Sequence, residues 1–229
     1  MTNLKCLATG SSGNCYLLNV GSSTILLDAG IPIEKITANT NINSIDFAFI
    51  SHEHKDHSLS MNKLDLRGVK ILDGITNQEV IKNQINAKNG GLLRVWQIPI
   101  HHGSTNNNAL VVKTDEECVL YATDFNICDY DLSDFKFTRV IVECNYIDKL
   151  LPQDMDFKTR RQINTHMGLN GLMIFLDKLD LSKCQELDLI HMSQGYGDSV
   201  LMGAKIYAKY RIRTGVCKQF GGIEYYGWK

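Results

Sequence analysis

The sequence predicts an α/β fold in which β-sheets are covered by helices. Short apolar runs typical of buried strands recur along the 229 residues and alternate with segments of helical spacing. Polar residues follow the last apolar residue of several strands, and ligands of layered α/β proteins gather at such a sheet edge. The chain has no repeat, low-complexity tract or linker, so we expect a single domain over residues 1–229.

The first half of the chain alternates strands with short helices. Leu4, Cys6 and Ala8 alternate with polar neighbours, which predicts a strand that ends at the turn-forming residues 9–14. Pro32 suits the first turn of the helix that follows the first hairpin. The expected elements are, in order, a strand at 4–8, a hairpin of 16–20 and 24–27, a helix at 31–39, a strand at 46–50, a helix at 58–66, a strand at 69–72 and a helix at 76–86.

The second half is richer in strands. Gly90 and Gly91 end the helix predicted before them, and the acidic turn 115–117 separates two apolar runs that form a further hairpin. The asparagine-rich stretch 106–108 is expected to be a loop. The expected elements are, in order, strands at 92–100, 109–113, 118–121 and 139–142, a helix at 170–179, a strand at 187–190, a helix at 200–210 and a strand at 215–220.

The composition is that of an ordinary globular protein. Apolar residues make up 44% of the chain and charged residues 21%, which excludes disordered and fibrous classes. The formal net charge of −1 excludes a global basic field of the kind that by itself indicates nucleic-acid binding, although a local basic patch is compatible with it.

The cysteines and the N-terminus predict a reducing, cytosolic location. Seven scattered cysteines without a Cys-x-x-Cys pair argue against a disulfide framework. The N-terminus lacks the apolar core of a signal peptide, and no run approaches the ~18 apolar residues of a membrane span. We therefore expect a protein of the cytoplasm that does not act at a membrane, whether its gene belongs to a cell or to something that infects one.

One six-residue stretch, 52–57, has the composition of a metal site and begins where an apolar strand ends. Imidazole nitrogens and carboxylate oxygens are the usual donors to zinc and similar divalent ions. His52 and His54 are two positions apart, so an extended backbone aims both at one point, whereas Asp56 and His57 are adjacent and diverge. This spacing suits two metal ions at ~3.5–4 Å that hold a bridging hydroxide as nucleophile.

Other polar residues stand at the ends of apolar strands further along the chain. They are Asp28, His102, Asp124, Glu143 and His191. A metal held in common at one edge of the sheets would explain why these residues recur at strand ends.

These residues resemble the metallo-β-lactamase superfamily, whose His-x-His-x-Asp-His signature is matched by His52, His54, Asp56 and His57. The resemblance implies a four-layered αββα sandwich of two mixed β-sheets flanked by helices. It also implies a hydrolase that uses two divalent metal ions, zinc or manganese, with the first pair of histidines on one metal and Asp56 and His57 on the other.

The resemblance implies three further ligands. An aspartate that bridges both metals falls on Asp124, and the last histidine of the second metal falls on His191. The third histidine of the first metal is His101 or His102; strand alternation favours His102, which would share a face with the apolar residues before it. Many relatives have aspartate after this histidine, where this chain has Gly103.

Four segments narrow the resemblance to the YycJ-like or WalJ-like branch and its small phage-borne relatives. They are Thr-Gly-Ser-Ser-Gly-Asn at 9–14, Glu-Cys-Asn-Tyr at 143–146, Thr-His-Met at 165–167 and His-Met-Ser at 191–193. The similarity extends over essentially the whole chain. The branch is associated with exonuclease action on DNA, which implies phosphodiester hydrolysis, and nothing in the sequence specifically indicates a β-lactam pocket.

We expect Asp56, Asp124 and His166 to be the catalytic residues. His166 is needed for neither ligand set, and a histidine beside such a centre can bind phosphate or donate a proton to the leaving oxygen. The alternative is that His166 is a core or surface histidine next to a helix.

Three residues are expected to support the ligands. Asp28, in an Asp-Ala-Gly motif that resembles the early aspartate of the superfamily, is expected to orient a ligand histidine, with a helix cap as the alternative. Glu143 and Asn145 are expected to act similarly, whereas Cys144 has no neighbouring base to activate it and is expected to pack in the core.

The sequence indicates the residues that contact the substrate less clearly than it indicates the metal ligands. Ser12 and Asn14 either line the site or form an ordinary turn. Lys158, Arg160 and Arg161 either contact backbone phosphates or form a solvated helix face.

The sequence therefore predicts a metal-dependent phosphodiesterase or nuclease whose partner is nucleic acid or a nucleotide, with a homodimer as a candidate assembly. A phosphodiesterase of cyclic or other small signalling nucleotides is the first alternative. A non-catalytic metal-binding interaction protein is the second.

Overall fold

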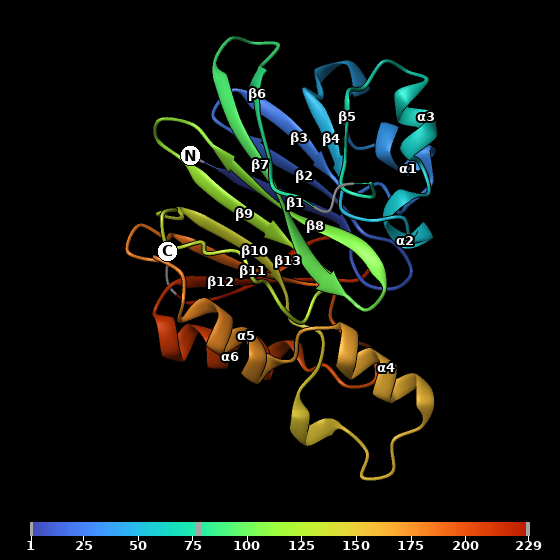
Figure 1. The fold of residues 1–229 in the computed structure, drawn as a ribbon, viewed down its shortest axis with the longest axis vertical. Helices are drawn as coiled ribbons and strands as arrows, with labels where there is room; N and C mark the ends of the chain where they lie inside the picture. The colour runs from blue at the N-terminus through green and yellow to red at the C-terminus, as the bar shows by residue number, and fades with distance from the viewer. Residues whose placement is uncertain (1, 77–78, 228–229) are drawn as a thin grey trace.

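Two β-sheets pack face to face, and helices cover the outer side of each sheet (Figure 1). The computed structural model describes residues 2–76 and 79–227. The first sheet has five strands in the spatial order β1 (Asn3–Ala8), β2 (Cys15–Val20), β3 (Ser23–Leu27), β4 (Phe47–Ile50) and β5 (Ile71–Asp73). The second has eight strands in the order β13 (Ile223–Tyr226), β12 (Arg213–Cys217), β11 (Glu186–Ile190), β10 (Arg139–Glu143), β9 (Cys118–Ala122), β8 (Thr105–Lys113), β7 (Leu92–His102) and β6 (Ile81–Asn86).

The helices form the two outer layers. Those near the five-stranded sheet are α1 (Ile33–Thr37), α2 (Lys55–Ser58) and α3 (Met61–Asp65), and those that follow β10 are α4 (Phe157–Thr165), α5 (Leu169–Leu176) and α6 (Ser199–Tyr210). Short 3-10 turns lie at Ile42–Ser44 and Asp148–Leu150. Figure 1 shows α5 and α6 against the eight-stranded sheet and α4 beyond its edge. The predicted αββα sandwich is therefore confirmed.

Parallel strands in both sheets bring their carboxyl ends to the same edge. In the first sheet β3, β4 and β5 are parallel, and in the second β9, β10, β11 and β12 are parallel. Each sheet also contains antiparallel pairs, so both are mixed. The loops that follow the parallel strands therefore meet between the sheets at one edge of the sandwich.

Three apolar clusters hold the layers together. The cluster between the sheets includes Tyr16 and Phe49 from one sheet and Val95, Leu110 and Ile141 from the other. A second cluster joins the eight-stranded sheet to α5 and α6, and a third joins the five-stranded sheet to α1 and α3. Because the first cluster draws side chains from both sheets, we propose that they form one domain.

The helix predicted over 76–86 is wrong. Residues 81–86 form β6, which pairs antiparallel with β7, and residues 77–78 lie outside the described part of the chain. Ile81 and Ile85 are four positions apart, a spacing that fits one face of a helix and equally one face of a strand. Pairing decides the outcome, since Ile85 is buried opposite Leu93 in the hairpin.

Other boundaries also differ from the predictions. Residues 106–108, expected to be a loop, belong to β8 and pair with β7. The last predicted strand, 215–220, is β12 at Arg213–Cys217, and the short edge strand β13 and helix α4 were not predicted. α4 is polar over most of its length and β13 has only four residues, so neither has a strong hydrophobic period.

Replacing Arg211 by glycine is expected to stabilise the protein by about 0.5 kcal/mol. Arg211 follows α6 in the left-handed region at φ 56°, where relief of strain outweighs the extra entropy that glycine gives the unfolded chain. The matched variant is Lys205→Gly in the middle of α6, which should lose about 1 kcal/mol. Urea unfolding of both variants measures the difference, and a destabilised Arg211→Gly protein would contradict the strain argument.

Candidate metal centre

The candidate ligands converge at the edge where the parallel strands end. His52 and His54 follow β4, and Asp56 and His57 lie in the short helix α2. The remaining three come from the second sheet: His102 is the last residue of β7, and Asp124 and His191 follow β9 and β11. The structure thus brings together all seven residues that the family resemblance implied as metal ligands.

Three strand-end residues at this edge have left-handed backbone. Asp28, Asp124 and His191 have φ angles of 55°, 50° and 53°. Such a conformation costs about 1–3 kcal/mol in residues other than glycine, and it persists where surrounding structure imposes it, often at functional sites. Here it turns the chain sharply at the end of each strand, with the side chain buried at the edge between the sheets.

The first group of donors consists of His52, His54, His102 and Asp124, whose ligand atoms all lie within 4.8 Å of one another. His52 Nε2 is 3.0 Å from His54 Nδ1. The Nε2 atoms of His52 and His102 are each 3.9 Å from Asp124 Oδ2. Three imidazoles and one carboxylate oxygen therefore face a common point.

The second group consists of Asp56, His57, Asp124 and His191, again within 4.8 Å. His57 Nε2 is 3.4 Å from Asp124 Oδ1 and 3.5 Å from Asp56 Oδ2. His191 Nε2 is 3.8 Å from Asp56 Oδ2. Asp124 thus presents Oδ2 to the first group and Oδ1 to the second.

The donor chemistry fits divalent metal ions. Nitrogen and carboxylate oxygen suit zinc and manganese, and each group supplies four donors. His191 Nε2 is buried and has no hydrogen-bond partner among the described residues, although its Nδ1 lies 3.1 Å from Glu143 Oε1. A buried ring nitrogen without a partner is costly unless something else binds it, so the cluster is a candidate metal site.

The charges in the cluster are strongly coupled. Burial by itself would lower the pKa of His57 and of His191, but the neighbouring carboxylates, Asp124 foremost, outweigh it. They raise the pKa of His57 well above its usual value and that of His191 to about 10. Burial and the charge of His57 hold the pKa of His52 well below its usual value. Without bound metal, protons on His57 and His191 balance the carboxylates.

The structure separates the two candidate histidines of β7. His102 is buried, and its Nδ1 lies 3.0 Å from the carbonyl oxygen of Thr165, which leaves Nε2 facing Asp124. His101 is exposed on the other face of the strand and pairs with Asp129 at 2.6 Å. His102, rather than His101, is therefore the one in the cluster.

Asp28 contacts the His57 ring and caps no helix. Its carboxylate accepts hydrogen bonds from His57 Nδ1 at 2.6 Å and from the backbone N–H of Ser51 at 2.8 Å. α1 begins instead at Pro32, without a side-chain cap. The helix-cap alternative is therefore wrong, and the contact with Nδ1 orients the His57 ring with Nε2 toward the cluster.

Two tyrosines complete this buried network, and the sequence reasoning missed both. Tyr121, on β9 of the second sheet, donates its hydroxyl to Asp28 Oδ2 at 2.5 Å. Tyr16 contacts Asn14 Oδ1 at 3.1 Å and Thr9 Oγ1 at 2.6 Å, and Thr9 Oγ1 accepts the backbone N–H of His191 at 2.8 Å. The available signal was that a buried tyrosine hydroxyl needs a partner, but the sequence could not name it.

Glu143, Asn145 and His166 lie on the other side of His191. Glu143 Oε1 is 2.5 Å from His166 Nδ1, and the Asn145 side-chain amide donates to the His191 carbonyl at 2.7 Å. The His166 and His191 rings stack with centroids 5.2 Å apart. Burial alone would lower the pKa of His166, but the Glu143 carboxylate raises it above the usual value. Cys144 is buried in the core, and burial raises the pKa of its thiol.

The candidate substrate residues are spread more widely. Asn14 is buried and its side-chain nitrogen lies 3.0 Å from His57 Nε2, so it belongs to the cluster's surroundings. Ser12 contacts Gln219 at 3.2 Å and lies outside the cavity lining. Arg161 lines the cavity, whereas Arg160 does not and donates to the Met155 carbonyl. The side chain of Lys158 lies outside the described part of the structure.

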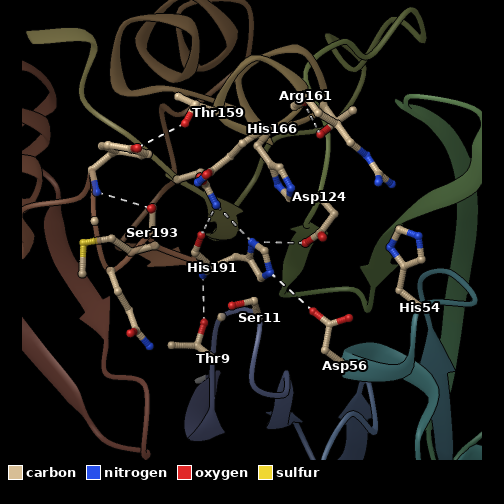
Figure 2. A pocket seen from close by; sticks show the side chains of 18 of the residues that line it. Thr9, Ser11, His54, Asp56, Asp124, Thr159, Arg161, His166, His191 and Ser193 are labelled. Atoms are coloured by element: carbon tan, nitrogen blue, oxygen red, sulfur yellow. Dashed lines mark hydrogen bonds and ion pairs between the residues drawn. The ribbon is translucent and has the colours of Figure 1, made fainter. Parts of the chain in front are cut away.

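A cavity of about 630 Å³ opens onto the cluster. It extends from the candidate ligands along α4 to the loop after His191, and Figure 2 shows Asp56, Asp124, His166 and His191 pointing into it. Binding sites for small ligands are typically about 300–1,000 Å³, so the cavity has the size of one.

Comparisons with known sequences point the same way. A family model described as the metallo-beta-lactamase superfamily matches residues 8–82, which include the His52–His57 cluster. The exodeoxyribonuclease WalJ of two Streptococcus pneumoniae strains is 41% identical over 56 residues, which are 22% of this chain. The match covers 21% of each relative, so the chain spans about a fifth of the length of these curated relatives.

Solved structures share the fold over most of the chain. YhfI from Bacillus subtilis, a metallo-beta-lactamase fold protein, has a TM-score of 0.70 at 16% identity and covers 98% of this chain and 99% of its own. A diphosphatase from the PhnP family has a TM-score of 0.60 at 12% identity and covers 100% and 98%, and the short form of human tRNase Z has 0.59 at 13% and covers 85% and 93%. At these identities the likeness concerns the fold. The chain therefore has the metallo-β-lactamase fold, and its residues 8–82, which hold the histidine cluster, match the model of the metallo-beta-lactamase superfamily.

Proposed function

We propose that the protein is a metal-dependent phosphodiesterase that acts on nucleic acid, from a strand end in the manner of an exonuclease. The observation that supports this most is Asp124, which presents one carboxylate oxygen to each of two four-donor groups. WalJ is an exodeoxyribonuclease, and two structures of the same fold are a tRNase and a diphosphatase. All three names refer to phosphate-ester or phosphoanhydride chemistry.

In this proposal each donor group holds one ion. His52, His54 and His102 would hold the first, Asp56, His57 and His191 would hold the second, and Asp124 would be available to both. When bound, two divalent ions, zinc or manganese, supply a hydroxide nucleophile at neutral pH and neutralise charge that builds on the phosphoryl group. Tyr121 and Asp28 act through His57, because Asp28 fixes the ring by its 2.6 Å contact and Tyr121 fixes Asp28.

His166 is the proposed proton donor to the leaving oxygen. Its Nδ1 is held by Glu143, so its Nε2 is the nitrogen left to act in the cavity. The Glu143 carboxylate raises the pKa of His166, which favours the protonated ring that a proton donor needs. Asp56 and Asp124 contribute as ligands, which is the sense in which we assign them to catalysis.

A phosphodiesterase of small nucleotides is the second candidate, and the cavity favours it. Of the side chains that line the cavity, Arg161 is the basic one besides the histidines, within the described residues. A long groove for a polynucleotide backbone would be expected to present several cations.

A substrate panel separates these candidates. Metal-depleted protein is incubated with Zn²⁺, Mn²⁺ or chelator and with single-stranded DNA, double-stranded DNA, RNA or cyclic nucleotides. We expect metal-dependent release of mononucleotides from strand ends. Preferential hydrolysis of cyclic nucleotides would instead favour the second candidate, and metal binding without hydrolysis of any substrate would favour a non-catalytic metal-binding interaction protein.

Metal binding should release protons. His57 and His191 have raised pKa values in the metal-free protein, and coordination requires neutral imidazole, so the ion that enters the second group displaces protons from both at neutral pH. Metal affinity should accordingly fall as the pH is lowered from about 8 to about 6, because protons compete more strongly. Calorimetric titration in two buffers of different ionisation enthalpy measures the number of protons released when metal binds. Heats that are independent of buffer would contradict the prediction, and the exposed His101→Gln variant is the control.

Arg161→Gln should raise KM for DNA about tenfold, whereas Arg160→Gln should leave it within about twofold. The two guanidinium groups are neighbours in sequence, but Arg161 lines the cavity and Arg160 turns back to the Met155 carbonyl. A charge-assisted contact to phosphate accounts for a loss of this size. Equal effects of the two variants would show that general helix charge, rather than a contact in the cavity, is responsible.

Across the described residues, every helix is too short or too polar to reach through a membrane. All seven cysteines are free thiols. The cytosolic location, the bacterial or phage origin and the homodimer stay predictions.

A further inference from the structure

The cavity has two chemically different ends, and α4 runs between them. At the C-terminal end of α4, the Thr165 carbonyl contacts His102. In its N-terminal half, Thr159 contacts the Tyr196 hydroxyl at 3.2 Å. Figure 2 shows His54 and Arg161 on one side of His166, with Thr159 and Ser193 on the other. We call the region of Asp156, Thr159, Ser193, Gln194 and Tyr196 the far end.

The charges of the two ends differ. The Arg161 side chain extends toward the side of the cluster where His54 lies (Figure 2). At the far end the charged side chain is Asp156, whose Oδ1 accepts the Thr159 backbone N–H at 2.7 Å. A phosphate at the far end would thus meet a carboxylate and, among the lining residues, no cation. The far end suits an uncharged part of the substrate.

The groups at the far end match a nucleoside. The Gln194 amide has no hydrogen-bond partner among residues 2–76 and 79–227, so both its donor and its acceptor are available. Amide side chains pair with the edges of bases, which also carry a donor beside an acceptor. Tyr196 adds an aromatic ring to the lining, and bases stack on such rings.

We propose that the far end is a nucleoside subsite, which takes the base and sugar of the nucleotide whose phosphate lies at the histidine cluster. Arg161 then faces the chain on the other side of the scissile bond. The proposal rests on the proposed phosphodiesterase function and deepens it, because it places the terminal nucleoside at the Gln194 end and the remainder of the strand at the Arg161 end.

The kinetic test compares two chromogenic esters with one leaving group. Thymidine 5′-(p-nitrophenyl phosphate) carries a nucleoside, and bis(p-nitrophenyl) phosphate does not. For the metal-loaded wild type we expect kcat/KM to favour the nucleoside ester about tenfold or more. Gln194→Ala should reduce that ratio about three- to tenfold, the loss of one or two hydrogen bonds. Gln185→Ala, an exposed glutamine outside the cavity lining, should not change the ratio.

The binding test does not depend on turnover. Thymidine 5′-monophosphate or inorganic phosphate is titrated into the protein while the side-chain amide resonances of Gln194 and Gln185 are followed by NMR. The Gln194 resonance, assigned by its loss in Gln194→Ala, should shift with the nucleotide and not with phosphate, and the Gln185 resonance should not shift with either.

The outcomes distinguish the two proposals. Hydrolysis of both esters at similar kcat/KM, or a ratio that Gln194→Ala leaves unchanged, would overturn the nucleoside subsite and leave the phosphodiesterase function in place. Failure to hydrolyse either ester with any metal would overturn the function. The NMR titration would then decide the subsite alone, and an unmoved Gln194 resonance would overturn that as well.

Discussion

Replacing Asp124 by asparagine is expected to reduce phosphodiester hydrolysis by about a thousandfold or more and to lower metal content from two ions per chain to one or none. Asparagine keeps the shape of the side chain but removes its charge and replaces one of the two oxygens that face the donor groups. Loss of a shared metal ligand removes several kcal/mol of transition-state stabilisation, and each ~1.4 kcal/mol is a factor of ten in rate.

Two measurements define this result. Elemental analysis gives the metal-to-protein ratio, and the rate is measured with the same preparation. Asp129→Asn, a change of an exposed aspartate paired with His101, is the matched control. An Asp124→Asn protein that keeps both ions and wild-type turnover would show that Asp124 is not shared between two metals. Circular dichroism checks that the fold is retained.

Replacing His166 by glutamine is expected to lower kcat by about 10²–10⁴ without changing metal content, the range typical of general acid catalysis. The effect should depend on the leaving group. p-Nitrophenolate departs without a proton, whereas the alkoxide of a natural phosphodiester needs one, so the variant should lose far more activity on DNA than on a p-nitrophenyl ester. Glu143→Gln should show the same pattern to a smaller degree, because Glu143 holds His166 Nδ1.

Other outcomes would reassign His166. A loss of metal from His166→Gln would make it a ligand, since it also belongs to a third group with Asp124, Glu143 and His191 within 4.8 Å. An equal loss on DNA and on p-nitrophenyl esters would make it a phosphate-binding residue rather than a proton donor. His101→Gln is the control for a histidine outside the cluster.

The sequence predicted the histidine cluster well because its signal is local. The donors of residues 52–57 lie within one short segment. Asp28, Asp124 and His191 each follow a strongly apolar strand, so the end of the predicted strand indicated the position of each. Strand alternation also favoured His102, and the structure places that residue in the cluster and His101 on the exposed face.

Features that depend on tertiary contacts could not be predicted. Tyr121 reaches Asp28 across the two sheets, 93 positions away in sequence. Arg160 and Arg161 are adjacent in a polar helix, and only the placement of α4 over the cavity distinguishes them. The strand at 81–86 depends on its partner β7, because its own apolar spacing fits either element.

The central claim is that two ions at the histidine cluster drive phosphodiester hydrolysis. The most direct test titrates metal-depleted protein with Zn²⁺ or Mn²⁺ and records the hydrolysis rate of bis(p-nitrophenyl) phosphate against metal equivalents. Two groups that share Asp124 predict a rate that rises to a plateau at two equivalents per chain. A plateau at one equivalent, or no hydrolysis at any ratio, would contradict the account.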